Sequence, residues 1–374
     1  MTDKRQTIIY GANGYTGKLV AESLARRRIP FYFAGRNRDK LETALAIVRV
    51  RLGGDAWKLD AEIVAIDNSV AALTPIFERC RVVCNVAGPF MQIAWPVVEA
   101  ALKTGCHYLD TTGEADWTRA IADRFGETFA SKGLLLAPAT SFMWAAGALA
   151  AEVVLEDREI DSLDILYQID NGLPSEASTR SFLRMACNDV SQFYLEQGEY
   201  KPWPNDVAHD VFVPYRCGKL RAHPWGGACE PVWLKGRVRN CKVLTAIGEH
   251  LIDGIIQAIR MFNEKSPGLD QAGREALTNA IGDQINTGEP PKDDPDIQRG
   301  VITVHGQSRT KTVTYVMNLS AAYSWTGEIQ AEAAELILAG RLQRPGFQSV
   351  ATAFDHRQLV RKFNALGYCS ALPN

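Results

Sequence analysis

A glycine-rich segment near the start of the chain has residue types and spacing that suit binding of phosphate groups. Residues 11–17 read Gly-Ala-Asn-Gly-Tyr-Thr-Gly, between an expected strand and an expected helix. Gly11 permits the tight turn out of the strand, Gly14 lets the backbone approach a pyrophosphate, and Gly17 lets the helix pack closely on the sheet. Phosphates bind at the helix N-terminus, where backbone N–H groups lack partners within the helix. The alternative is a glycine turn that serves packing only. The predicted cofactor-binding residues of this segment are Gly11, Asn13, Gly14, Tyr15, Thr16 and Gly17.

The end of the second expected strand indicates which dinucleotide would bind. A carboxylate there favours NAD, whereas Arg36 stands in that place, nineteen residues after Gly17. A guanidinium pairs with the 2′-phosphate of NADP, so Arg36 and the adjacent Asn37 predict NADP(H). The alternative is that Arg36 is a solvated loop residue. Asp67, after the third expected strand, would meet the adenine amino group or would cap the following helix.

Two further strand ends would lie beside the nicotinamide, since ligands bind at the carboxyl edge of a parallel sheet. Asp110 and Glu114 project from the end of the fifth expected strand. Either carboxylate could orient the nicotinamide amide or handle a proton, and the alternative is that one or both cap the next helix. We nominate Asp110 as catalytic. The fourth strand ends in a Gly-Pro turn. The predicted cofactor contacts of both strand ends are Ala87, Gly88, Pro89, Phe90, Gly113 and Glu114.

Candidates for a proton donor and for substrate binding lie in the second half of the chain. Tyr167 is at an expected strand end and is nominated as catalytic. Ser175, Ser178 and Arg180 lie in a loop that leads into a helix. They could bind a carboxylate or phosphate of the substrate through the helix N-terminus and the guanidinium. The alternative is an ordinary Ser/Thr helix cap.

The elements that position these residues form two patterns. Short β-branched or aromatic runs alternate with amphipathic stretches in the first part, which predicts a doubly wound parallel sheet of the Rossmann type. The later pattern has strands and helices in blocks, which predicts an inserted α+β domain. The first set of strands is expected at 6–10, 31–34, 63–66, 82–86, 107–109 and 134–137. The later strands are expected at 163–169, 301–305 and 312–320, with helices at 179–197, 250–262, 331–342 and 355–366. The domain boundaries are expected at 1–140 for the NADP-binding domain, 141–330 for a substrate and dimerisation domain, and 331–374 for helices that return to the first domain.

Composition excludes several other classes of function. The formal net charge is −2 in 374 residues, which gives no reason to expect nucleic acid or an anionic membrane as partner. The basic run at residues 24–28 is interpreted as a solvated helix end. No apolar stretch is long enough to span a membrane, and no signal peptide is visible. Eight cysteines without a CxxC pair argue against a zinc site, so no metal is expected, and they suggest reduced thiols in the cytoplasm.

The combination GANGYTG, AGR, NVAGPF and HYLDTTGE resembles the saccharopine dehydrogenase-like oxidoreductases, nearest to the trans-acting enoyl reductase branch. The similarity covers the first 140 residues and returns at 323–338 and 346–366. The resemblance implies a Rossmann domain with NADP, an inserted α+β domain and closing helices. It also implies reduction of a C=N or polarised C=C bond by NADPH. One departure concerns residues 138–144, which read PATSFMW where that branch carries a motif with two aspartates.

We therefore expect an NADPH-dependent reductase of a C=C or C=N bond in an apolar or cyclic small molecule. Because the two aspartates are missing, the alternative is a non-catalytic NADP-binding or scaffolding protein of the same fold. A third hypothesis is a synthase or lyase whose bound redox cofactor cycles internally. A homodimer through the second domain is the expected assembly.

Overall fold

The computed structural model describes residues 5–371 apart from 189–190, 215–216 and 286–287. Its contacts divide the chain into two compact units, each made of three segments. The first unit comprises Met1–Thr112, Ala120–Phe142 and Tyr323–Asp355. The second comprises Gly113–Arg119, Met143–Ala322 and His356–Asn374. These boundaries differ from the predicted ones, because the last segment divides between the units instead of joining the first as a whole.

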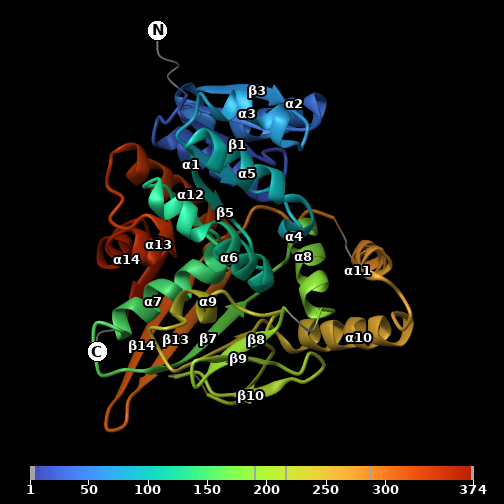
Figure 1. The fold of residues 1–374 in the computed structure, drawn as a ribbon, viewed down its shortest axis with the longest axis vertical. Coiled ribbons are helices and arrows are strands. Elements are labelled where there is room, and N and C mark those ends of the chain that lie inside the picture. Colours follow the sequence, from blue (N-terminus) through green and yellow to red (C-terminus); the bar gives the residue numbers. More distant parts are fainter. Residues whose placement is uncertain (1–4, 189–190, 215–216, 286–287, 372–374) are drawn as a thin grey trace. The chain divides into compact units, whose positions relative to one another are not determined.

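The first unit is built on a seven-stranded sheet, of which Figure 1 labels β1, β3 and β5. The strand order is β15-β6-β5-β4-β1-β2-β3. All of its strand pairs are parallel. The strand order reverses between β1 and β4, which is the position where doubly wound sheets bind their ligands. The predicted Rossmann fold is therefore confirmed. The strands are β1 (Thr7–Tyr10), β2 (Phe31–Gly35), β3 (Ala61–Ala65), β4 (Val82–Asn85), β5 (His107–Asp110), β6 (Leu135–Ala137) and β15 (Gly346–Phe347).

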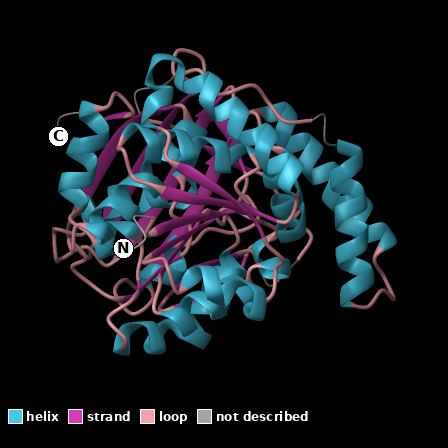
Figure 2. Ribbon diagram, turned by 90° about the horizontal axis from the view of Figure 1, so that it is seen from above, coloured by secondary structure: helices cyan, strands magenta, loops and turns pink. Residues whose placement is uncertain are grey.

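Helices follow the strands of this sheet and cover it, as the alternating pattern predicts (Figure 2). The helix α1 packs on α2, and α3 packs on α5, so neighbouring crossovers share a layer. The helical elements that follow these strands are α1 (Tyr15–Arg26), α2 (Arg38–Leu52), η1 (Gly53–Lys58), α3 (Val70–Phe77), α4 (Phe90–Ile93), α5 (Trp95–Thr104) and α6 (Ala115–Ser131).

Two elements from the far end of the chain complete the first unit. The short strand β15 pairs with β6, and α13 (Val350–Ala353) follows it. The helix α12 (Ala322–Leu338) is buried along most of its length. Where α12 passes the end of α1, Arg27 forms an ion pair with Glu328 at 2.6 Å and with Glu332 at 3.3 Å. All three side chains are largely buried. Residues Tyr323–Asp355 are therefore part of the first unit.

The second unit is built on a mixed seven-stranded sheet in the order β16-β14-β13-β7-β12-β8-β9. The strands β7, β13 and β14 are long, and their predicted positions are confirmed. Only β7 and β12 pair in parallel. The strands are β7 (Ser162–Asp170), β8 (Phe193–Glu196), β9 (Glu199–Pro202), β12 (Asn240–Ala246), β13 (Arg299–Gln307), β14 (Thr312–Ser320) and β16 (Cys369–Ala371). A separate hairpin is formed by β10 (His209–Val211) and β11 (Leu220–Ala222).

The helices of the second unit agree with the sequence pattern in part. The predicted helix at 179–197 is wrong beyond Ala186, because Phe193 and Leu195 alternate with less buried residues and form β8. The helix α11 escaped prediction because it buries little more than Thr278, Ile281 and Gly282. The helical elements are η2 (Phe142–Ala146), α7 (Gly147–Val154), α8 (Glu176–Ala186), α9 (Glu230–Leu234), α10 (Glu249–Lys265), α11 (Gln271–Ile285) and α14 (His356–Ala365).

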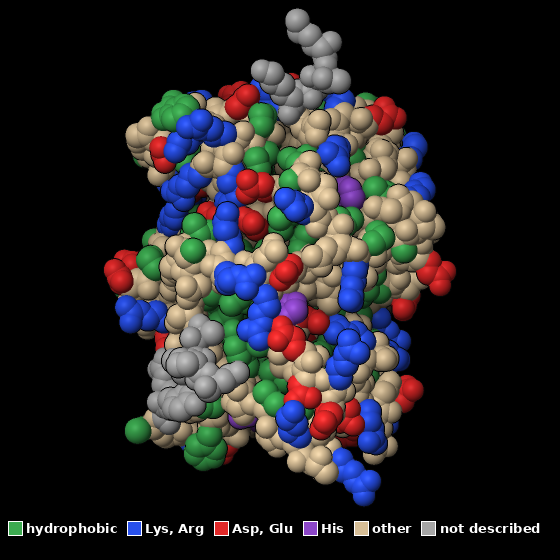
Figure 3. Space-filling model, turned by 90° about the vertical axis from the view of Figure 1, so that its left-hand side faces the viewer, with side chains coloured by type: hydrophobic (Ala, Val, Ile, Leu, Met, Phe, Trp, Pro, Cys, Tyr) green, Lys and Arg blue, Asp and Glu red, His purple; other side chains and the backbone are tan. Residues whose placement is uncertain are grey.

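The surface shown in Figure 3 carries basic and acidic side chains interspersed with one another. Across the described ranges, no helix is both long and apolar enough to cross a membrane. None of the eight cysteines, all of which lie in these ranges, forms a disulfide. Among the side chains that the structure describes, no group of three or more His, Cys, Asp and Glu could hold a metal ion.

Candidate cofactor site

The glycine loop between β1 and α1 has a backbone that larger residues could not adopt. Gly11 has φ +86°, and a Cβ there would lie 2.8 Å from atoms of Ala87. A Cβ on Gly17 would lie 2.5 Å from the carbonyl oxygen of Ala12, so the helix packs on the loop only because Gly17 has no side chain. A Cβ on Gly14, the N-cap residue of α1, would meet only the Gly11 carbonyl, and no side chain caps the helix. This end of α1 is consequently open to an anion.

Arg36 follows β2 and is exposed next to the glycine loop. Tyr10, at the end of β1, lies close enough to Arg36 and Asp67 to interact electrostatically with both side chains. The pKa of Tyr10 is raised by burial, while the Arg36 guanidinium acts in the opposite direction. The carboxyl ends of β1, β2 and β3 therefore present one cation and one carboxylate near Tyr10.

Three neighbours of Arg36 refine the predicted roles. The Asn37 side chain caps α2 by accepting a hydrogen bond from Lys40 N–H at 2.9 Å. The helix α3 is capped by Ser69, so the alternative that Asp67 caps it is wrong. A Cβ on Gly35 would lie 3.1 Å from Asn13 Oδ1, which means that Asn13 reaches across to the residue before Arg36.

The Gly-Pro turn after β4 lies directly against the glycine loop, because Ala87 is the residue that a Cβ on Gly11 would meet. The Ala87 N–H donates to Asn85 Oδ1 at 3.2 Å, the Gly88–Pro89 peptide bond is cis, and Phe90 begins α4. Ala87 thus lies beside Gly11, and Gly88, Pro89 and Phe90 follow it in the turn. Thr16 lies in the first turn of α1.

Asp110, nominated as catalytic, is fully buried and holds loops of the first unit together. Its Oδ1 accepts from the N–H groups of Thr112 at 3.0 Å and Ala139 at 2.9 Å. Its Oδ2 accepts from the Tyr108 hydroxyl at 3.0 Å, and that hydroxyl also accepts from the Asn85 amide. These contacts make Asp110 an anchor of the carboxyl edge and do not support a role as proton donor.

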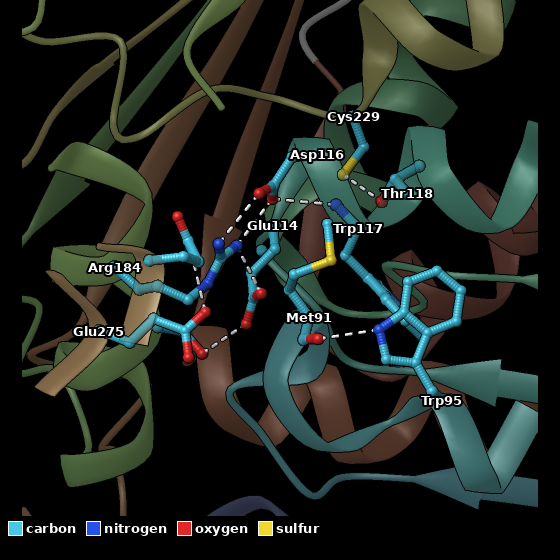
Figure 4. A network of polar contacts seen from close by, with 12 residues as sticks. Met91, Trp95, Glu114, Asp116, Trp117, Thr118, Arg184, Cys229 and Glu275 are labelled. Carbon is cyan, nitrogen blue, oxygen red and sulfur yellow. Dashed lines mark hydrogen bonds and ion pairs between the residues drawn. The ribbon is translucent and has the colours of Figure 1, made fainter. Parts of the chain in front are cut away.

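Glu114, predicted to contact the cofactor, is one of two carboxylates in a buried ion cluster of the second unit (Figure 4). The Arg184 guanidinium lies 2.7 Å from Glu114 Oε2 and 2.7 Å from Asp116 Oδ1. Ser181 donates to the other Glu114 oxygen at 2.9 Å. Burial opposes the charge of Arg184, but the two carboxylates outweigh it and raise its pKa. Gly113, next to Glu114, accepts a hydrogen bond from Trp144 Nε1 at its carbonyl.

Tyr167, the second catalytic nomination, has no exposed surface. Its hydroxyl accepts from Gly147 N–H at 2.7 Å, and it lies 2.6 Å from Glu230 Oε1 and 3.1 Å from the Trp144 carbonyl. One phenolic proton cannot serve both oxygens at once, and a protonated Glu230 would supply a second proton for these contacts. Burial raises the pKa of Glu230 to about 8, which agrees with this arrangement. The position is structural, and it does not support Tyr167 as a donor to substrate.

The three predicted substrate residues have partners within the second unit. Ser175 is the N-cap of α8: its hydroxyl accepts from Ser178 N–H at 3.2 Å and donates to the Ser178 hydroxyl at 3.0 Å. The alternative of an ordinary helix cap therefore holds for both serines. Arg180 is exposed and donates to Asp283 from two guanidinium nitrogens, at 3.0 and 2.6 Å. The guanidinium is thus already engaged with a carboxylate of α11.

Several residues of this framework carried no individual prediction. Tyr10 and Asn85 are the last residues of β1 and β4 and pair in register, and Asn85 also pairs with Asp110 at the end of β5. Tyr108 lies two residues before Asp110 in β5. For Tyr10 and Asn85, the position at a strand end was the sequence signal that could have indicated a role in the site. No sequence signal pointed to Gln330 or Glu230, because each forms hydrogen bonds with residues that are distant in the sequence.

Two family models match the chain. Residues 145–372, which are more than half of it, match the "Family of unknown function (DUF5938)". The chain belongs to this family. Residues 7–130 match the "Saccharopine dehydrogenase NADP binding domain". The predicted resemblance and the predicted cofactor are thereby confirmed: the first unit is an NADP(H)-binding domain of the saccharopine dehydrogenase type.

Relatives and solved structures extend this result. A human "Saccharopine dehydrogenase-like oxidoreductase" is 28% identical over 144 residues, covering 36% of this chain and 34% of that protein. A "Trans-acting enoyl reductase" of Mycobacterium leprae is 34% identical over 146 residues, covering 37% and 33%. The chain thus spans about a third of the length of these curated relatives. The saccharopine dehydrogenase (L-Glu forming) of Saccharomyces cerevisiae has the same fold, with TM-score 0.60 and 10% identity over 99% of this chain and 100% of that one.

Proposed function

We propose that the protein is an NADPH-dependent reductase of a C=C or C=N bond in an apolar or cyclic small molecule. The observation that carries the proposal is the juxtaposition of the open glycine loop at Gly14 with Arg36 in the first unit. Arg36 is the residue that would select the 2′-phosphate of NADPH over NADH. The name of the mycobacterial relative supports reduction of a C=C bond.

The residues of this chain would bind and orient the cofactor in a simple division of labour. Backbone N–H groups at the start of α1 bind the pyrophosphate, and Arg36 binds the 2′-phosphate. The turn from Ala87 to Phe90 lies beside Gly11 and orients the nicotinamide end. When bound, NADPH supplies the hydride. The proton then comes from a group other than Asp110 and Tyr167, whose side chains are buried among their own partners.

Two measurements test the proposal in order. Fluorescence titration with NADPH tests binding, and loss of NADPH absorbance in the presence of enones, enoyl esters and cyclic imines tests turnover. Micromolar binding together with turnover of one of these classes is expected. Absence of NADPH binding would overturn the proposal.

A second candidate function is a non-catalytic NADP-binding or scaffolding protein of the same fold. The observation that favours it is that the two nominated catalytic side chains have structural positions, and that Arg180 is engaged by Asp283. NADPH would then bind without being consumed. Turnover of any substrate at a rate that scales with protein concentration would eliminate this candidate.

The homodimer and the cytoplasmic location remain predictions from the sequence. Light scattering at several protein concentrations tests the first, with a mass of about twice the 41.2 kDa of the chain as the expected result. Fractionation of cells that express a tagged chain tests the second.

A further inference from the structure

The helix α12 runs beside α1 in the first unit, in the same direction. Near its start, the Tyr323 ring packs edge-on against the Tyr15 ring, with centroids 4.8 Å apart and planes at 75°. Further along, Gly327 lies against Leu19, and Glu328 accepts a hydrogen bond from Ser23 at 2.8 Å. Each step along α12 therefore meets a later residue of α1, so both helices begin at the glycine loop.

This approach is fixed on two sides of α12. A Cβ on Gly327 would lie 2.8 Å from the carbonyl carbon and oxygen of Leu19, so the glycine is what lets the helices come this close. On the side facing the sheet edge, Thr326 Oγ1 accepts from Phe142 N–H at 3.0 Å. The Gln330 amide donates to the carbonyls of Asp110 at 3.0 Å and Thr140 at 2.7 Å. These contacts fix the position of α12 and therefore the position of Tyr323.

Tyr15 is the residue that this arrangement constrains. It follows Gly14 directly and starts α1, so it stands where the pyrophosphate of a dinucleotide would bind. Its side chain is only 4% exposed, and Tyr323 packs on it from the other end of the sequence. Aromatic pairs in this edge-to-face geometry fix each other's orientation.

We propose that Tyr323 is a positioning residue of the dinucleotide site, acting through Tyr15 at the pyrophosphate end. The inference rests on the proposed function, because it presupposes NADP(H) binding at the glycine loop. It extends the site beyond the NADP-binding domain match, which ends at residue 130, into the part of the chain that matches the family of unknown function. The dinucleotide site is therefore completed by α12.

The test compares NADPH dissociation constants, from fluorescence titration, of the full chain and three variants. Tyr323→Leu removes the ring and should weaken NADPH about threefold to tenfold, whereas Tyr323→Phe keeps the ring and should stay within about twofold of the original chain. Tyr194→Leu is the matched control, since Tyr194 is a half-buried tyrosine of the second unit that packs on Trp203. It should leave NADPH binding unchanged.

A double-mutant cycle with Tyr15→Leu identifies the route of the effect. If Tyr323 acts through Tyr15, the loss from Tyr323→Leu should largely vanish in the Tyr15→Leu background. An undiminished loss in that background would overturn the proposed route. Adenosine 2′-monophosphate keeps the 2′-phosphate but lacks both phosphates of the pyrophosphate, so Tyr323→Leu should weaken its binding less than that of NADPH. Equal weakening would likewise contradict a role at the pyrophosphate.

The outcomes separate this inference from the function on which it rests. If the original chain does not bind NADPH, the proposed function fails. If it binds NADPH and a folded Tyr323→Leu variant binds equally well, only the role of Tyr323 fails. Melting temperatures without cofactor verify folding. Should Tyr323→Leu not fold, Tyr323→Met fills the same space with a flexible chain and takes its place in every comparison.

Discussion

Arg36 is the single side chain on which the choice of cofactor depends, and it is exposed at the end of β2. Arg36→Glu removes a charge-assisted contact with the 2′-phosphate and adds repulsion, so NADPH binding should weaken by about 2–4 kcal/mol. NADH has no 2′-phosphate and should be affected far less. Fluorescence titrations with both cofactors measure the difference. Arg38→Glu is the control, since Arg38 is an exposed arginine of α2 that pairs with Glu42 at 3.6 Å. Equal losses for NADPH and NADH would refute the assignment.

Two arginines on α8 allow the contribution of a buried and an exposed ion pair to the free energy of unfolding to be compared. Arg184→Leu leaves Glu114 and Asp116 buried without their cation and should reduce the free energy of unfolding by about 3–5 kcal/mol. Arg180→Leu removes an exposed pair with Asp283 and should cost less than about 1 kcal/mol. Urea unfolding of both variants measures the two values. A similar, small loss for both would mean that the buried cluster contributes little.

The residues that sequence reasoning placed well are those whose role depends on local backbone. Gly11, Gly14 and Gly17 act through the turn and the helix that they begin, and both are visible in the sequence. The buried contacts of Asp110 and Tyr167 were not predicted, because partners such as Ala139 and Glu230 are distant in the sequence. Their burial depends on tertiary packing, which no local pattern encodes.

At the scale of the helix, α1 packs closely on the glycine loop because Gly17 has no side chain. Gly17→Ala places a methyl group 2.5 Å from the Ala12 carbonyl oxygen, so the helix must shift. We expect the free energy of unfolding to fall by about 1–3 kcal/mol, together with a loss of NADPH affinity. Gly54→Ala is the control, because its Cβ would meet no atom within 4 Å. Thermal unfolding and NADPH titration measure both effects, and an unchanged Gly17→Ala variant would contradict the packing role.

At the scale of elements, prediction succeeded where the hydrophobic pattern is strong. Six of the seven strands of the first sheet follow from β-branched runs separated by helices. The pattern failed at β15, where Gly346–Phe347 is too short to be recognised, and at β8, which continues an apparent helix. Both strands exist only because a neighbour offers hydrogen bonds: β6 for the first, and β9 and β12 for the second.

The stability of the whole molecule should depend on pH through Glu230. Its ordinary pKa is 4.5, and burial raises it to about 8 in the folded chain. The folded state therefore binds an extra proton between these values, and its stability is full below pH 4.5 and falls as pH rises to about 8. The expected slope is about 1.4 kcal/mol per pH unit. Urea unfolding from pH 5 to 8 measures it.

Glu230→Gln provides the comparison, because its amide can donate to the Tyr167 hydroxyl without titrating. The difference in unfolding free energy between the original chain and this variant should change with pH along the slope expected for Glu230. A difference that is constant over this range would show that Glu230 is ionised in the folded state.

Each unit is assembled from three separate stretches, so the chain passes from one to the other five times. During synthesis, the first unit cannot be finished when its sixth strand leaves the ribosome, because α12 and β15 are encoded some two hundred residues later. Until these segments are synthesised, one side of α1 and the edge of β6 remain uncovered. A nascent chain arrested before residue 323 should therefore remain sensitive to protease, and it should depend on chaperones until the last third of the polypeptide has emerged.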